Sequence, residues 1–164
     1  AAIRCDDPVV YMEHKNLWPL EGAVDEAATE PALGEAAVRR EGADLTIVSW
    51  SATVHEALAA AQLLADEGTD AEVIDLRTLW PWDRERVFQS VEKTGRLLVT
   101  HEAVAVAGFG AEVAASVAEH VRLKAPIARL GAPRAPIAYA PTMENVLRIT
   151  AEKIAQRART LMKS

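Results

Sequence analysis

The chain has 164 residues, of which 50% are hydrophobic and 26% are charged, as expected for one compact α/β domain with a buried core. A formal net charge of -6 argues against nucleic acid as a main partner, because phosphate binding requires clustered Lys and Arg. The apolar runs are too short for a membrane helix. Cys5 is the only cysteine, which excludes an intrachain disulfide and a cysteine-based zinc site.

The first 34 residues carry two signals. Residues 8–12 form a short apolar run with two valines, which predicts a buried strand. Residues 16–34 contain two prolines and two glycines among acidic and small residues, and they show no period of 2 or 3.6. We therefore expect this second stretch to be an extended linker between two domains.

From Asp44 onward, short β-branched runs alternate with amphipathic segments. Strands are predicted at 45–50, 71–76, 96–101 and 127–130, with residues 37–40 as an antiparallel edge. The crossovers between these runs are a dozen or more residues long. This alternation predicts an α/β fold of the doubly wound class, with a mostly parallel sheet and helices on both faces.

Helix ends are predicted from polar side chains. Thr53 and Glu56 have the spacing of a capping box, in which a hydroxyl and a carboxylate satisfy free amides at a helix start. Asp83 and Thr150 are expected to cap later helices, and a third helix is predicted at 110–122. The tail after residue 141 is expected to run as one continuous helix to Lys163.

His101 and Glu102 follow a predicted parallel strand, at the edge where open α/β sheets bind ligands. Such a pair could serve acid–base chemistry, orient a ligand or form a subunit contact. Because no nucleophile or metal-binding set accompanies it, a subunit interface or the rim of a site is the preferred interpretation. We assign no catalytic and no cofactor-binding residue.

Two other motifs favour structural roles. Gly108-Phe109-Gly110 resembles part of a dinucleotide fingerprint, but Val113 occupies the position of its third glycine, so a tight turn with close helix packing is preferred. Trp80 and Trp82 could belong to a cofactor box, yet such clusters more often fill the seam between a strand and the helix that follows.

Two parts of the chain carry distinctive motifs: VIDLRTL at 73–79 with PWD at 81–83, and TGRLLVTHEA at 94–103. Together with runs at 2–13, 32–36, 39–48, 108–114 and 125–129, they are similar, in the same order, to the carboxy-terminal part of beta subunits of thiamine-diphosphate-dependent 2-oxo acid dehydrogenases. The resemblance covers nearly the whole chain, so we expect the sequence to be the carboxy-terminal portion of such a subunit.

The resemblance implies two parts: residues 1–34 end a pyrimidine-binding domain and form a linker, and residues 35–164 form a transketolase-type carboxy-terminal domain. It also implies a heterotetramer with alpha subunits and a second beta subunit, within a multienzyme complex that has a lipoyl acyltransferase core. Thiamine diphosphate and magnesium would bind at the alpha–beta boundary and not to this chain alone. A cytoplasmic protein in bacteria, or a mitochondrial matrix protein in eukaryotes, is expected.

The resemblance further implies a structural potassium ion near the start of the chain. The corresponding residues would be Ala2, Ile3, Cys5 and Asp7, acting largely through backbone carbonyls. An ordinary turn into a strand is the alternative. Cys5 replaces a common Asp and Asp7 a common Asn, so one carboxylate of the family's pattern is missing here.

A subunit interface is predicted at His101, Glu102, Val106 and Phe109, together with the helix that begins at Gly110. The loop is apolar at a sheet edge, where a monomer would expose polar residues. Alanines at 111, 114, 115 and 118 give the helix a small-residue face. In the competing arrangement, this face packs on the domain's own sheet and the loop folds inward.

Two alternatives in function remain open. The chain could be the terminal domain of a deoxyxylulose-phosphate synthase or a transketolase, which share this domain. The HEA and PWD motifs favour the dehydrogenase, which performs oxidative decarboxylation and transfers the acyl group to lipoyl. Alternatively, the chain is only an assembly module. Its sequence does not distinguish pyruvate, branched-chain 2-oxo acids and acetoin as substrates.

Overall fold

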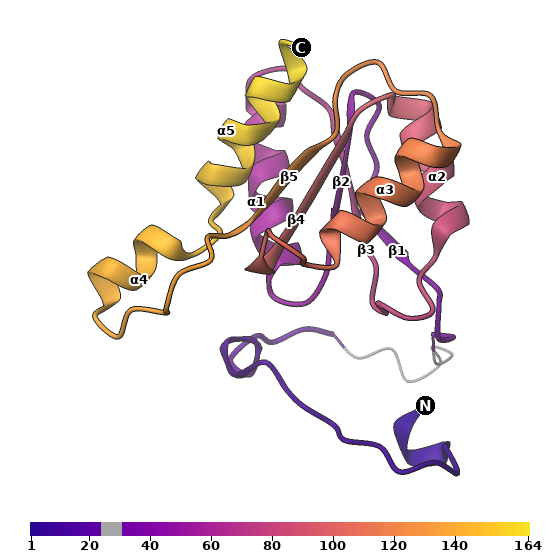
Figure 1. Ribbon diagram of the computed structural model, residues 1–164, viewed down its shortest axis with the longest axis vertical. Helices are drawn as coiled ribbons and strands as arrows, with labels where there is room; N and C mark the ends of the chain where they lie inside the picture. Colours follow the sequence, from indigo (N-terminus) through magenta and orange to yellow (C-terminus); the bar gives the residue numbers. More distant parts are fainter. Residues whose placement is uncertain (24–30) are drawn as a thin grey trace.

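The computed structural model describes residues 1–23 and 31–164. The predicted linker falls partly on residues 24–30, which lie outside the described residues. The amino-terminal arm, residues 1–23, contains two short 3₁₀ turns, Ala2–Arg4 and Lys15–Leu17, and passes below the carboxyl edge of the sheet in Figure 1.

A five-stranded sheet forms the centre of the domain (Figure 1). The strands are β1 (Ala37–Arg40), β2 (Leu45–Ser49), β3 (Ala71–Asp75), β4 (Leu97–Val104) and β5 (Ala128–Ala132). Their order is β1-β3-β2-β4-β5, with β1 antiparallel to β3 and all other pairs parallel. The predicted mostly parallel sheet with an antiparallel edge is therefore confirmed.

Helices cover both faces of the sheet, as the fold class requires (Figure 1). One face carries α1 (Thr53–Asp66) and α5 (Ala151–Met162), and the other carries α2 (Arg84–Thr94) and α3 (Gly110–His120). Two apolar cores result, one on each face of the sheet. The short helix α4 (Pro141–Leu147) projects from the domain, and none of its residues is buried.

The strand predicted at residues 8–12 does not form. That stretch is extended but unpaired, and the side chains of Val10 and Tyr11 are 84% and 78% exposed. An apolar run becomes a strand only when a neighbouring strand accepts its backbone hydrogen bonds. The described part of the chain offers this run no such neighbour.

The predicted capping box is also wrong. Helix α1 begins from a turn whose cap residue, Ala52, already has helical backbone angles, so Thr53 lies inside the helix and is buried. The Glu56 carboxylate instead accepts a hydrogen bond from the Ala151 amide at 2.8 Å. Glu56 thus satisfies a free amide at the start of α5, 95 residues along the chain.

The carboxy-terminal tail is two helices, not the expected continuous one. Helix α4 ends at Leu147, and Arg148 has extended backbone angles. Thr150 then caps α5 by accepting from the Lys153 amide, as predicted. Within the described residues, no helix is both long and apolar enough to cross a membrane.

Candidate functional site at the carboxyl edge of the sheet

The strand order fixes where a ligand crevice would lie. The chain leaves β2 toward β3 on one side and leaves β4 toward β5 on the other, so the crossover direction changes between β2 and β4. Open parallel sheets bind ligands at the carboxyl ends of strands at such a point. Trp50 follows β2 there, and His101 lies beside it on β4.

Side chains of the domain itself fill this crevice. The rings of Trp50 and His101 stack with centroids 4.9 Å apart, and Phe109 meets Trp50 edge-on at 5.8 Å. The contacts continue from Phe109 to the α2 side of the domain. Together they form an aromatic row, in the order His101, Trp50, Phe109, Trp82, Phe88 and His120.

His101 is the most enclosed titratable group at this edge, with 1% of its surface exposed. Its Nδ1 is buried and has no hydrogen-bond partner among the described residues. Burial lowers the pKa of His101 below its ordinary value of 6.5; the backbone of Ala103 opposes this shift, and the charge of Arg129 adds to it. The imidazole is therefore neutral at pH 7.

Three residues in the left-handed backbone region follow three adjacent strands. Ser51, Arg77 and Ala107 have φ of 54°, 57° and 57°, after β2, β3 and β4 respectively. Such backbone costs on the order of 1 kcal/mol in a residue other than glycine and persists only where surrounding contacts enforce it. Sequence patterns gave no sign of this strain.

The predicted interface residues are buried to different extents. His101 is buried, and Phe109 is half-buried within the aromatic row. Glu102 is exposed and lies 2.9 Å from Nε2 of His14 on the amino-terminal arm. Val106 is 63% exposed on the loop between β4 and α3, residues 105–109, called the edge loop below.

Helix α3 packs on the sheet through Val113, Ser116 and Val117, which are buried. Of the predicted small-residue face, Ala111 and Ala114 are half-buried, and Ala115 and Ala118 are exposed. An interface at this face stays a prediction.

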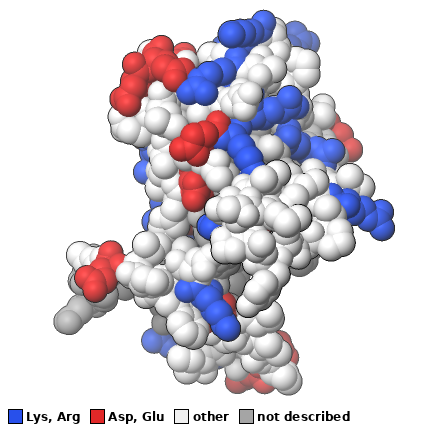
Figure 2. All heavy atoms as spheres, turned by 90° about the vertical axis from the view of Figure 1, so that its left-hand side faces the viewer, with Lys and Arg blue, Asp and Glu red and all other residues white. Residues whose placement is uncertain are grey.

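A pocket of about 370 Å³ lies between the amino-terminal arm, the start of α1 and the segment that carries α4. Leu17 and Leu20 line the arm side, and Ile137 and Leu147 line the other. Figure 2 shows that Lys and Arg gather over α5, whereas the projecting part around α4 is largely uncharged. Exposed apolar side chains there are Ile137, Tyr139, Met143 and Val146.

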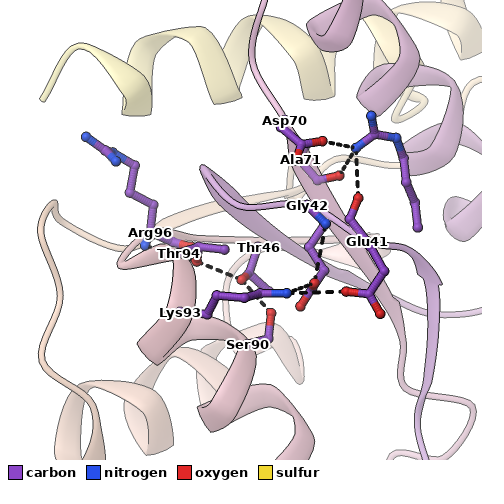
Figure 3. Close-up of polar contacts among 11 residues, drawn as sticks. Glu41, Gly42, Thr46, Asp70, Ala71, Ser90, Lys93, Thr94 and Arg96 are labelled. Carbon is purple, nitrogen blue, oxygen red and sulfur yellow. Dashed lines mark hydrogen bonds and ion pairs between the residues drawn. The ribbon is translucent and has the colours of Figure 1, made fainter.

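A polar cluster lies at the opposite edge of the sheet, at the amino ends of the parallel strands (Figure 3). Glu72 of β3 is only 2% exposed and pairs with the ammonium group of Lys93 from α2, which also lies 3.3 Å from Glu41. Burial alone raises the pKa of Glu72, but hydrogen bonds from Lys93 and Ser90 outweigh it and lower the pKa. The sequence pattern did not predict this pair, because Glu72 lies within an otherwise apolar strand.

The predicted potassium residues lie in and just after the first 3₁₀ turn of the amino-terminal arm. Ile3 is fully exposed, and the Cys5 sulfur accepts a hydrogen bond from the Asp7 amide at 3.4 Å. The potassium site stays a prediction. For magnesium, residues 1–23 and 31–164 contain no group of three or more His, Cys, Asp or Glu placed to hold a metal ion.

Comparison with known proteins gives consistent matches. Residues 34–154 match the family described as "Transketolase, C-terminal domain". The beta subunit of acetoin:2,6-dichlorophenolindophenol oxidoreductase from Cupriavidus necator is 45% identical over 164 residues, 99% of this chain and 48% of that protein. The beta subunit of the pyruvate dehydrogenase E1 component from Bacillus subtilis is 45% identical over 136 residues, 81% of this chain and 42% of that protein.

A split-gene transketolase, described as an inactive beta4 tetramer, has a similar solved structure, with a TM-score of 0.74 and 26% identity. The similarity covers 87% of this chain and 46% of that chain. Further relatives include a mitochondrial beta subunit of 2-oxoisovalerate dehydrogenase. The chain spans about half the length of the curated relatives it matches, or less.

Proposed function

The chain belongs to the transketolase C-terminal domain family, and we propose that it is the assembly domain of a 2-oxo acid dehydrogenase beta subunit. The observation that carries the proposal is the ring stacking between β2 and β4. At the edge where this fold usually binds a ligand, the rings of Trp50 and His101 stack on each other. Apolar side chains are instead exposed on the edge loop and around α4.

The proposed partner at the edge loop is a second beta subunit. Val106 and the exposed alanines of α3 would meet their own copies across a two-fold axis, since such an axis brings one patch against itself. An alpha subunit and a lipoyl acyltransferase core complete the proposed assembly. Residues 1–34 would belong with a pyrimidine-binding domain and its linker, and residues 35–164 with the assembly domain.

Thiamine diphosphate and magnesium belong to the proposed complete enzyme and supply its decarboxylation chemistry. This chain's own contribution is to hold subunits together. The substrate class is a 2-oxo acid or acetoin, in keeping with the names of the relatives. The 45% identity to beta subunits, against 26% to the split-gene transketolase, favours this function over a transketolase.

Calorimetric titration of the purified chain with thiamine diphosphate and Mg²⁺ tests the assembly-only role. We expect no binding in the micromolar range. A micromolar dissociation constant, which corresponds to about -8 kcal/mol, would contradict the proposal. A matched titration of a full-length relative that contains the pyrimidine-binding domain provides the positive control.

A further inference from the structure

The edge loop is held at both ends. Near β4, the Ala105 amide donates to the Ala132 carbonyl at 3.0 Å, and Arg129 donates to the Ala105 carbonyl at 2.9 Å. Ala107 adopts the left-handed backbone region within the loop, which then enters α3 at Gly110. The loop therefore has a defined shape that neighbouring groups must enforce.

The imidazole of His101 is one of those neighbouring groups. A β-carbon on Gly110 would lie 2.6 Å from Nε2, and one on Gly108 would lie 2.9 Å from Cε1. On the β5 side, a β-carbon on Gly131 would also lie 2.9 Å from Cε1. Glycine backbone thus presses against the ring from the edge loop, α3 and β5, and the indole of Trp50 stacks on it.

Apart from the Ala103 backbone, which raises the pKa of His101, the surroundings of the ring favour its neutral form. From β5, the charged group that acts on it is Arg129, which lowers its pKa. On its own strand, Glu102 is exposed and engaged by His14 on the arm. At the start of α3, the first acidic residue, Glu112, pairs with Arg84 and accepts from Ser116. From the β2 side, the contact is the uncharged Trp50 ring.

We propose that His101 is an acid-sensitive switch for the edge loop. The neutral ring supports the loop through the glycine contacts. Protonation releases the loop, because the Arg129 guanidinium would repel an imidazolium there and none of the groups just named is a carboxylate that pairs with it. Release lets the ring reach water, where the charged form is hydrated. The inference concerns the loop alone and holds whether or not a second subunit covers it.

The direction of the pH effect follows from proton linkage. The open loop exposes His101, which then takes up a proton near the ordinary value of 6.5, whereas the closed loop keeps the ring neutral to lower pH. Opening is therefore favoured as pH falls below 6.5. Between 6.5 and the lower pKa of His101 in the closed state, the opening constant rises by up to about tenfold for each pH unit, since one proton is taken up.

Hydrogen exchange of the edge-loop amides between pH 7 and pH 5, corrected for the intrinsic pH dependence, tests the switch on the whole chain. We expect exchange of residues 105–109 to rise below pH 6.5, by up to about tenfold per unit, while β2 amides stay protected. His101→Gln should abolish the rise, and His55→Gln, which changes an exposed histidine on α1, should retain it. A flat wild-type profile, or a rise that persists in His101→Gln, overturns the proposal.

An NMR titration of the His101 ring in the wild-type chain needs no variant and keeps the test decisive if His101→Gln fails to fold. A His101 titration midpoint below 6.5 that coincides with loss of edge-loop protection supports the switch. A midpoint at or above 6.5, or one that leaves the loop amides unchanged, refutes it.

Discussion

Replacing Lys93 with Met should destabilise the domain, because it leaves the Glu72 carboxylate buried without its cation. Glu72 is 2% exposed, and its remaining contacts include uncharged donors, the Ser90 hydroxyl and the Gly42 amide at 3.4 Å. Removing one partner of a fully buried pair costs about 3–5 kcal/mol. Since the Lys93 side chain is 45% exposed, solvent screening reduces the expected loss to about 1–3 kcal/mol.

Urea unfolding of the wild type, Lys93→Met, Glu72→Gln and the double variant measures this loss as a double-mutant cycle. Glu72→Gln should cost less than Lys93→Met, because the freed ammonium can reach Glu41 and water. The double variant should recover most of the Lys93→Met loss. Arg159→Met, which breaks an exposed pair, is the matched control and should have no measurable effect.

Unfolding of Lys93→Met at the same urea concentration as the wild type would contradict this prediction. A larger loss for Glu72→Gln than for Lys93→Met would contradict it equally. Either result would mean that Glu72 is neutral or hydrated in the folded protein, and that the contacts drawn in Figure 3 contribute nothing through charge.

Three further predictions follow from other contacts. Glu56→Ala should cost about 1 kcal/mol in urea unfolding by freeing the first amide of α5, and an unchanged midpoint would contradict this. Gly110→Ala should cost about 1–3 kcal/mol by crowding the imidazole beside it, whereas Gly22→Ala, with open space around it, should be neutral; equal effects would refute the crowding. Thermal unfolding should show stability falling as pH drops below 6.5, through His101, and again below 4.5, through Glu72, because both folded pKa values are lowered. A midpoint that does not change from pH 7 to pH 4 would contradict that sign.

The parallel sheet was predictable because its signals are local. Short runs rich in β-branched and apolar residues alternate with amphipathic segments from residue 45 onward, and this alternation alone predicts a mostly parallel sheet. Asp83 and Thr150 were identified as caps because a cap contacts amides only three residues away.

Features that depend on distant partners escaped prediction. Glu56 has the local spacing of a cap yet serves a helix 95 residues later, and residues 8–12 have strand composition but no strand beside them. At the candidate site, the sequence located His101 at the right edge of the sheet. It could not show that Trp50 and three glycines enclose the ring, because these contacts join four separate elements.

The most direct test of the account is sedimentation of the chain at tens of micromolar. Phe109 belongs to the aromatic row, so Val106→Asp alone is the clean change at the proposed interface. The account predicts that the wild type is a dimer and that Val106→Asp is a monomer with an unchanged thermal midpoint. A monomeric wild type, or a variant that remains a dimer, would contradict assembly through the edge loop and α3.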